Sequence, residues 1–387
     1  MEALGLHVSE RARPGCEPCG VLAGRANARW FLMPLRPRAV CASSLALIQP
    51  LRFTPRLFKR LASASIRFGL SGLWLRGRAY VSGINRIAAV FGSGAVHAAF
   101  MTGTAGPHRK LVMQCMDGDG SVRGYAKVSR TPDVHALLAN EAATLRALHA
   151  LDLQSALIPR VLLHEVRDGT AVLATDAIGT PPRVPRAFLP DALHRAFLDE
   201  LAQRTAPTWS RDGDPLLQTW HAQVQGVAGR LSDGWRERFR RVLHVLSQQP
   251  GAIASRGLAH GDFTPVNTFR HRDRLYVFDW EYAGGDYPAD FDLIRYLVAV
   301  MRLESPQPAQ LATAVLDALT REFDREEREA RLRLIAYACV YALRGACRQP
   351  AFPGTALKWT GGRDDALLLD ALLAESRRGH AAGGASP

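Results

Sequence analysis

Lysine is scarce in this chain. Lys59, Lys110, Lys127 and Lys358 are its only four, although Lys and Arg together number 49 against 36 Asp and Glu, for a formal charge of +13. Such an arginine bias is more typical of a GC-rich genome than of a nucleic-acid-binding face, and no nucleic-acid-binding motif accompanies it. The charge alone therefore gives only weak support for anionic partners, and we expect no nucleic-acid partner.

The cysteines do not form the pattern of a disulfide framework. There are six in 387 residues. Cys16 and Cys19 make one CxxC, but no second CxxC or HxxxH stands nearby to complete the four ligands of a structural zinc site. The first residues also lack the apolar core of a secretory signal. We therefore expect a protein of the reducing cytoplasm.

Long apolar runs are missing as well. Residues 87–107 carry no formal charge, but they are rich in Gly, Ala, Ser and Thr and include His97, so they predict strand and loop rather than a membrane span. Hydrophobic residues make up 47% of the chain and charged residues 22%. These values exclude disorder as the main state and predict a globular protein with a substantial core.

Residues 1–84 are predicted to be an N-terminal extension that contains a basic amphipathic helix over 52–78. Thr54 and Pro55 suit the start of that helix. Its apolar stripe consists of Leu57, Leu61, Ala64 and Phe68, with the basic residues largely off the stripe. Two interpretations stay open: the helix packs on the rest of the protein, or it lies on the anionic inner face of a membrane.

The remaining chain predicts a β-rich segment followed by a helical one. Strands are expected over 95–103, 109–117, 122–130, 160–166 and 170–179. One helix lies among them, beginning at Thr131-Pro132-Asp133.

We assign residues 85–180 to a first lobe with a connector and residues 181–378 to a second lobe. The second lobe is mostly helical, with a β insert at 256–282, and residues 379–387 are expected to be a disordered tail. The order predicts an α+β enzyme of two lobes with a cleft.

Three polar residues stand out in LAHGDFTPVNTFRHRDRLYVFDWEYAG, residues 258–284. Asp262 lies in a loop, Asn267 follows five residues later, and a strand-like run presents Asp279. Carboxylate and amide oxygens suit Mg²⁺, which takes one or two protein carboxylates plus substrate phosphates. A carboxylate left off the metal could accept a proton from an attacking hydroxyl. The alternative is that Asp and Asn are simply common turn residues.

HGDFTPVN (260–267) followed by FDWE (278–281) resembles the HGDxxxxN and DWE pair of the aminoglycoside phosphotransferase and choline kinase-like family. The resemblance covers roughly residues 85–345. It implies a protein-kinase-like fold, with a β-rich N-lobe that holds one helix and a mainly helical C-lobe. It also implies transfer of the γ-phosphate of ATP, with Mg²⁺, to a hydroxyl of a small molecule.

The same resemblance implies a role for each matching residue. Asp262 resembles the catalytic base, and Asn267 and Asp279 resemble the magnesium ligands. His260 resembles a structural histidine that braces the catalytic loop. Asp292, in YPADFDLIRYL, resembles the residue that supports this loop from the next helix.

A second pair of residues can be predicted independently of that loop. Glu141 shares the apolar face of the helix that follows Thr131, and a buried carboxylate needs a cation or a hydrogen-bond partner. Lys127, on the strand GYAKVSR, could provide one. In the family this lysine holds nucleotide phosphates and the glutamate holds the lysine. An exposed lysine and a tolerated glutamate are the alternative.

Two glycine-bearing loops could cover the phosphates. Gly103 and Gly106 in GTAGPHRK permit close approach of the backbone, and FGSGAV (91–96) is an equal alternative. Residues 172–179 stand where the family's hinge takes adenine.

The acceptor is not encoded in these motifs. A polycationic antibiotic calls for an acidic acceptor site, whereas the acidic residues at 322–329 alternate with arginines. A neutral or anionic acceptor, such as a sugar or a surface-polysaccharide precursor, agrees better with the charge than an aminoglycoside or amino alcohol. The competing class is a pseudokinase or nucleotide-binding scaffold, and no motif specifies ATP over GTP or an oligomeric state.

Overall fold

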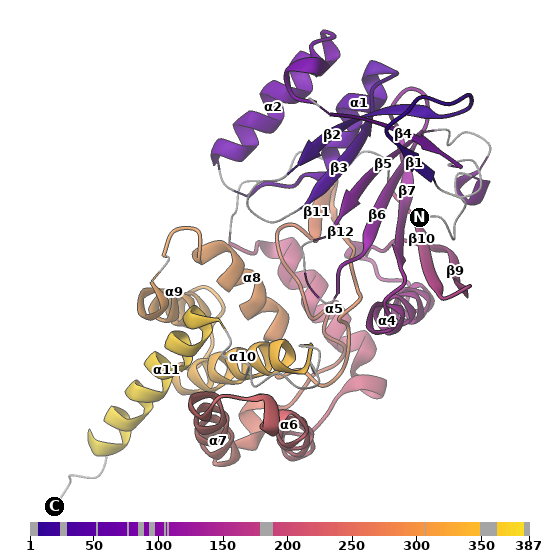
Figure 1. Ribbon diagram of the computed structural model, residues 1–387. Coiled ribbons are helices and arrows are strands. Elements are labelled where there is room, and N and C mark those ends of the chain that lie inside the picture. Colours follow the sequence, from indigo (N-terminus) through magenta and orange to yellow (C-terminus); the bar gives the residue numbers. More distant parts are fainter. Residues whose placement is uncertain are drawn as a thin grey trace, which may run out of the picture. The chain divides into compact units, whose positions relative to one another are not determined.

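The computed structural model describes the chain except for residues 1–6, 24–28, 52, 76, 84–88, 93–96, 104–105, 107, 179–188, 306, 349–361 and 383–387. The described chain divides into two units (Figure 1). Unit 1 comprises Met1–Arg186 and Val266–Tyr282, and unit 2 comprises Ala187–Pro265 and Ala283–Pro387. Within the described residues, no helix is long and apolar enough to cross a membrane.

Unit 1 is built on an antiparallel sheet of nine strands in the order β1-β4-β2-β3-β5-β6-β7-β10-β9. The strands are β1 His7–Ser9, β2 Glu17–Ala23, β3 Trp30–Pro34, β4 Gly77–Ser82, β5 His97–Thr102, β6 Leu111–Met116, β7 Val122–Ser129, β9 Val161–Arg167 and β10 Thr170–Asp176. The expected strands after residue 95 coincide with β5, β6, β7, β9 and β10. Alternation explains this agreement, since β7 buries Val122, Ala126 and Val128 with less buried residues between them.

One long helix and a small second sheet also belong to unit 1. Helix α4, Pro132–Ala150, begins after Thr131 as the sequence predicts and packs on β9 and β10. The small sheet has the order β11-β12-β8, from Thr268–His271, Arg274–Val277 and Ala156–Leu157. Helices α1 (Arg38–Ser44) and α2 (Phe53–Arg67) pack together, and α1 packs on β3.

Residues 1–84, expected to be a separate N-terminal extension, contribute strands to the sheet of unit 1. Strands β1 to β4 come from the expected extension 1–84, yet β3 pairs directly with β5, with Phe31 opposite Met101 and Leu32 opposite Phe100. The expected segments 1–84 and 85–180 therefore share one continuous sheet. Strand pairing joins them because β3 and β5 would otherwise each present an unpaired edge.

The helix expected over 52–78 is shorter than predicted. It ends at Arg67, because Gly69 adopts a left-handed φ of +88° and closes the helix. The N–H of Gly69 donates to Ile66 O (2.9 Å) and the N–H of Leu70 donates to Ser65 O (2.9 Å), the bonding pattern of a Schellman cap. The following residues form the short turn Ser71–Leu73 and then β4.

Unit 2 is helical around one large apolar core. Its helices are α5 Ala192–Trp209, α6 Gly213–Val227, α7 Asp233–Ser247, α8 Phe291–Met301, α9 Pro308–Arg321, α10 Glu327–Arg348 and α11 Arg363–Ala382. The core includes Trp220, Trp235, Phe239 and Tyr337. Helix α11 continues to Ala382, so the first four residues of the expected tail 379–387 are helical, and the last five lie outside the described residues.

Candidate active site

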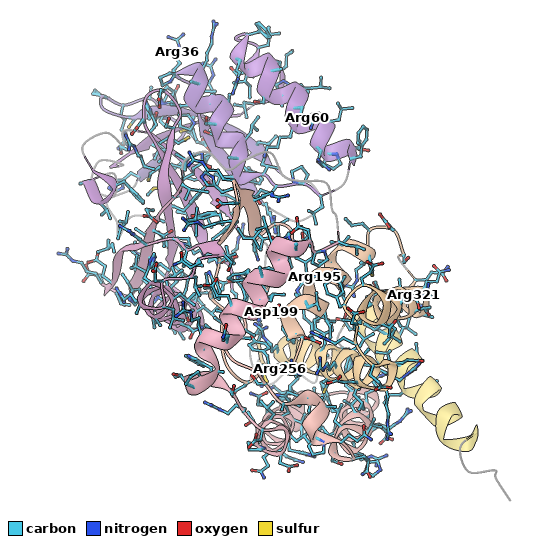
Figure 2. The ribbon with its side chains drawn as sticks, turned by 180° about the vertical axis from the view of Figure 1, so that it is seen from behind. Arg36, Arg60, Arg195, Asp199, Arg256 and Arg321 are labelled. Carbon is cyan, nitrogen blue, oxygen red and sulfur yellow. The ribbon has the colours of Figure 1, made fainter. Side chains whose placement is uncertain are left out.

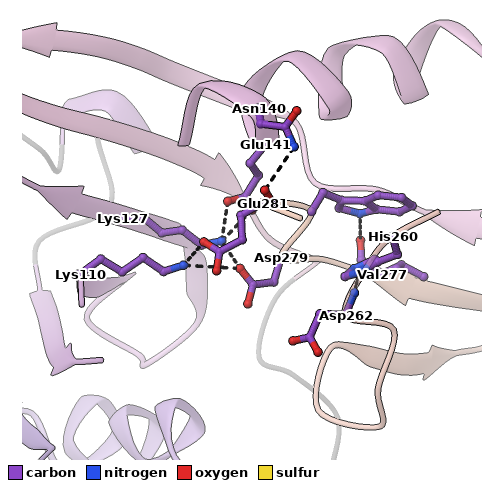
Figure 3. A network of polar contacts seen from close by, with 10 residues as sticks. Lys110, Lys127, Asn140, Glu141, His260, Asp262, Val277, Asp279 and Glu281 are labelled. Carbon is purple, nitrogen blue, oxygen red and sulfur yellow. Dashed lines mark hydrogen bonds and ion pairs between the residues drawn. The ribbon is translucent and has the colours of Figure 1, made fainter. Parts of the chain in front are cut away.

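Lys127 lies at the centre of a buried polar cluster in unit 1 (Figure 3). Its Nζ is 2.7 and 2.6 Å from the two carboxylate oxygens of Glu141 on α4, and 2.5 Å from Oδ1 of Asp279, which follows β12. The strand, the helix and the small sheet therefore each contribute one charged group. The structure brings together the pair predicted from the sequence and adds Asp279 to it.

Burial of Glu141 explains why the pair forms. The side chain lies on the face of α4 that also buries Leu138 and Leu145, and Glu141 is 2% exposed. A carboxylate there requires a cationic partner. For Lys127, burial alone lowers the pKa, but the carboxylates of Asp279, Glu141 and Glu281 outweigh burial and raise the pKa above its usual value. The lysine is therefore held as an ammonium ion.

Asn267 and Asp279 lie at the open end of the β11–β12 hairpin. Asn267 directly precedes β11, and its carbonyl accepts a hydrogen bond of 3.2 Å from the N–H of Phe278, the residue before Asp279. Asp279 has a φ of +69°, a left-handed conformation that aspartate adopts more readily than most residues. The hairpin thus sets the direction of the Asp279 carboxylate through its backbone.

The oxygen donors around Asp279 suit a divalent cation. One carboxylate oxygen each from Glu141, Asp279 and Glu281 lie within 4.8 Å of one another, and the side chain of Asp279 is 29% exposed. Hard oxygen donors are those that Mg²⁺ prefers. All three carboxylates contact a lysine, but Asp279 is the most exposed of them, so its carboxylate is the one most open to an incoming cation, and Asn267 lies at the same end of the hairpin.

Lys110 and Glu281 also belong to the cluster, and the sequence did not predict them. Lys110, just before β6, forms an ion pair with Glu281 and lies 3.9 Å from Oδ1 of Asp279. Asn140 donates a hydrogen bond of 3.1 Å to the backbone oxygen of Glu281. Two features of the sequence point to these residues: lysine is rare in the chain, and Glu281 is the last residue of the FDWE motif.

The loops considered for phosphates are only partly described. The N–H of Gly103 donates to Lys110 O (2.8 Å), which closes the loop between β5 and β6, and Gly106 has a φ of +157°. Residues 104–105 and 107 of this loop, and 93–96 of the alternative FGSGAV, lie outside the described residues. The assignment of Gly103 and Gly106 to phosphate binding stays a prediction, as does that of the hinge 172–179, whose last residue is also outside them.

In unit 2, Asp292 holds the loop that carries Asp262. The buried carboxylate of Asp292, in the first turn of α8, accepts hydrogen bonds from the backbone N–H of His260 (2.6 Å) and of Gly261 (2.9 Å). The N–H of Asp262 donates to Nδ1 of the buried His260 (3.2 Å), and Gly261 takes a left-handed φ of +79°. His260 and Asp292 thus lie where a loop-bracing role requires them.

Two arginines that the sequence did not predict also contact this loop. Arg295 on α8 lies 3.0 Å (Nε) and 2.9 Å (Nη2) from Oδ1 of Asp262, and its guanidinium lies over the ring of Tyr341. Arg344 donates to Gly261 O (2.8 Å). A guanidinium at this distance orients the Asp262 carboxylate. In the sequence, the feature that points to Arg295 is its position one helical turn after Asp292.

Comparisons with known proteins identify the family of the chain. The family model described as the phosphotransferase enzyme family matches residues 91–331. No curated protein sequence matches the chain. A thermostable mutant of the aminoglycoside phosphotransferase APH(4)-Ia has a similar structure, with a TM-score of 0.51 at 15% identity, over 76% of this chain and 98% of that one.

A putative fructosamine-3-kinase from Thermobifida fusca matches more loosely, with a TM-score of 0.42 at 17% identity, over 76% of this chain and 99% of that one. The similarity to APH(4)-Ia confirms the two-lobed α+β, protein-kinase-like fold. Since the family model covers well over half of the chain, the protein belongs to the phosphotransferase enzyme family and is a small-molecule kinase that acts on hydroxyl groups.

Proposed function

We propose that the protein transfers the γ-phosphate of ATP, with Mg²⁺, to a hydroxyl of a small neutral or anionic acceptor, such as a sugar or a surface-polysaccharide precursor. The observation that carries this proposal is the ammonium of Lys127, held between Glu141 and Asp279 in a buried cluster. Positioning and electrostatic stabilisation are what phosphoryl transfer requires of a protein, and this cluster supplies both.

In this proposal, side chains of unit 1 bind the nucleotide phosphates and the metal. Lys127 contacts the phosphates, and Glu141 holds the lysine in place. Asn267 and Asp279 hold Mg²⁺, which offsets phosphate charge when bound. Gly103 and Gly106 bring backbone N–H groups to the phosphates.

Asp262 acts on the acceptor. Its carboxylate accepts a hydrogen bond from the attacking hydroxyl, orients it and takes its proton. Arg295 fixes the direction of that carboxylate, and His260 with Asp292 fixes the backbone that carries it. Because Asp292 and the Asp262 loop are held by several hydrogen bonds, little reorganisation is needed at the moment of transfer.

The charges of unit 2 argue against a polycationic acceptor. Unit 2 contains 22 Lys and Arg and 22 Asp and Glu, so it carries no acidic excess. The acidic residues near 322–329 are partly used in ion pairs: Glu329 binds Arg333 and Glu327 lies 3.7 Å from Arg331. A neutral or anionic acceptor needs no acidic surface.

The test separates nucleotide binding from transfer. Asp279→Asn is expected to weaken Mg²⁺-dependent ATP binding and turnover together. Asp262→Asn is expected to keep the ATP affinity while turnover falls by about a hundred- to ten-thousand-fold, the usual contribution of a positioned general base. Calorimetric titration of MgATP and a phosphate-transfer screen over sugars, amino alcohols and aminoglycosides measure both quantities.

Asp273→Asn is the matched control, because Asp273 is an exposed residue of the same hairpin and should affect neither quantity. Loss of ATP binding in Asp262→Asn with normal binding in Asp279→Asn would reverse the two roles. ATP binding without transfer to any acceptor, unchanged by Asp262→Asn, would favour a nucleotide-binding scaffold instead.

A further inference from the structure

Helix α2 buries one face and exposes an apolar one. Ala62 and Ile66 are 1% exposed and pack into a cluster with Met33 of β3 and Cys41 of α1. The stripe predicted from the sequence faces the other way: Leu57 is 44% exposed and Leu61 54%. The helix therefore packs on unit 1 through Ala62 and Ile66 and leaves Leu57 and Leu61 in solvent.

Exposed apolar side chains continue beyond α2. Seven large ones lie within residues 53–73, namely Phe53, Leu57, Phe58, Leu61, Phe68, Leu70 and Leu73. We call these seven side chains the apolar ridge. Phe58 packs edge-on against Trp74, with ring centroids 4.7 Å apart, so this ridge residue has a fixed packing partner. An apolar surface of this kind marks a site of interaction.

Basic residues border the ridge. Arg56, Arg60 and Arg67 each precede a ridge residue directly, so they form a row along one side of the helical stripe. Arg60 and Arg67 are exposed. Arg36, on the segment before α1, lies in the same part of unit 1 as Arg60 (Figure 2).

The surrounding sequence contains no acid at all. From residue 18 to residue 116 there are 14 Lys and Arg and no Asp or Glu. This segment therefore carries +14, and the rest of the chain carries −1 of the total of +13. The excess positive charge of the protein is thus confined to the segment that holds the apolar ridge.

From this combination we infer that α2 docks on an anionic lipid bilayer, with the apolar ridge in the interfacial layer and the arginines at the lipid phosphates. Leucine and phenylalanine beside a row of cations are the composition of helices that lie in a membrane interface. An anionic bilayer attracts each nearby arginine. The ridge supplies apolar burial that charge alone does not.

Two other occupants agree less well with these residues. A nucleic acid is bound through its phosphates, which leaves the leucines of the ridge without a function. A second copy related by two-fold symmetry would bring the same surface on each copy together, and with it the arginine row of one copy close to that of the other. Lipid satisfies both the apolar and the basic residues.

The test uses the full chain and two kinds of vesicle, phosphatidylcholine alone and phosphatidylcholine with phosphatidylglycerol in equal parts. Sedimentation with vesicles gives the partition coefficient. We expect binding only to the anionic vesicles. Leu57→Gln with Leu61→Gln should lower the partition coefficient on anionic vesicles by about tenfold or more, because apolar burial is lost. Arg60→Gln with Arg67→Gln should lower it by about 25-fold, at roughly fivefold per charge.

Matched controls lie on β9 of the same unit. Leu162 is 41% exposed and Val166 is 58% exposed, so Leu162→Gln with Val166→Gln removes similar apolar surface away from α2. Arg167→Gln removes an exposed charge there. Neither control should change vesicle binding, and every variant should keep its nucleotide affinity and thermal stability.

Three results would overturn the inference. One is equal binding to both kinds of vesicle. Another is unchanged binding by the Leu57→Gln, Leu61→Gln variant. The third is a wild-type dimer in lipid-free sedimentation velocity that this variant converts to a monomer, because the ridge would then join two copies of the chain.

Discussion

At the residue scale, the polar cluster around Lys127 contains more negative than positive charge. Lys110 and Lys127 oppose Glu141, Asp279 and Glu281, which leaves a formal excess of one negative charge. Without a metal ion, this net negative cluster does not attract the negatively charged triphosphate of a nucleotide. A divalent cation reverses the sign of the excess, which gives a physical reason for the proposed metal dependence of nucleotide binding.

Replacing Glu141 by Gln tests the lysine pair. The glutamine is nearly isosteric, but it offers the ammonium one neutral amide oxygen in place of two carboxylate oxygens. One hydrogen bond to a charged group, which contributes about 1.5–3 kcal/mol, is therefore lost. We expect kcat/KM for the nucleotide to fall by roughly 10- to 100-fold. Because Lys127 keeps Asp279 as a partner and the substitution removes the negative excess of the cluster, the melting temperature should be unchanged or higher.

Enzyme kinetics and thermal unfolding of the same preparation measure both effects. Glu165→Gln, at an exposed position on β9, is the control and should change neither. Unaltered kinetics in Glu141→Gln would refute a role for the pair. A lower melting temperature with proportionally lost activity would show that Glu141 serves the fold instead.

Some of the site's contacts could be predicted from the sequence and others could not. Glu141 could be paired with Lys127 because a glutamate on an apolar helix face needs a cation, and lysines are rare. The contacts of Lys110 with Glu281 and of Arg295 with Asp262 depend on how segments 171 and 33 residues apart are folded together. No local pattern encodes such distances.

At the element scale, Gly69 ends α2 and so determines where the apolar ridge turns away from the helix. A β-carbon at Gly69 would stand 2.8 Å from the guanidinium of Arg38, in addition to the cost of the left-handed φ of +88°. Gly69→Ala is expected to lower the free energy of unfolding by about 1–2 kcal/mol. Denaturant unfolding measures this difference.

Gly72→Ala is the comparison for that prediction. Gly72 lies three residues further on, and a β-carbon there meets nothing within 4 Å. It should therefore change the free energy of unfolding by less than about 0.5 kcal/mol, as surface substitutions usually do. Equal effects of the two substitutions would mean that the cap at Gly69 contributes little.

The elements themselves were predictable where hydrophobic periodicity was strong. Strands β5, β6, β7, β9 and β10 begin and end close to the predicted residues, and helix α4 begins where the sequence predicts. Strands β1 to β4 were not predicted, since residues 1–50 show little alternation and these strands are stabilised by pairing. Glu17 in β2 lies opposite Val81 in β4, so the pairing depends on contacts across more than 60 residues.

At the scale of the whole molecule, the two units differ in how their charges are used. Unit 1 carries the entire excess of +13, since unit 2 has equal numbers of basic and acidic residues. In unit 2 many of these charges are paired, and Asp290 is one example. It precedes α8 and accepts hydrogen bonds from Arg325, at 2.7 and 3.1 Å, and from the buried Arg333.

This network predicts an acid-sensitive fold. Burial by itself raises the pKa of Asp290, but the guanidinium groups of Arg325 and Arg333 outweigh burial and hold the pKa below its ordinary 3.8. A carboxylate with a depressed folded-state pKa stabilises the fold above its unfolded pKa, and this contribution is lost as the pH falls through the folded value.

Asp290→Asn measures that contribution directly. Asparagine tolerates the left-handed φ of 59° at this position, so the substitution changes the charge and leaves the backbone preference. It leaves Arg333, which is 2% exposed, without its aspartate, and removing one partner of a buried ion pair costs about 3–5 kcal/mol. Urea unfolding should show this loss at about pH 7 and a smaller difference from the wild type at about pH 3, where the unfolded aspartate is protonated.

Asp317→Asn is the control. Asp317 lies 3.9 Å from Arg321 and both side chains are exposed, so this substitution should cost no more than about 1 kcal/mol. A difference between wild type and Asp290→Asn that does not shrink in acid would show that hydrogen bonding or packing, rather than the charge of Asp290, holds these arginines in the core.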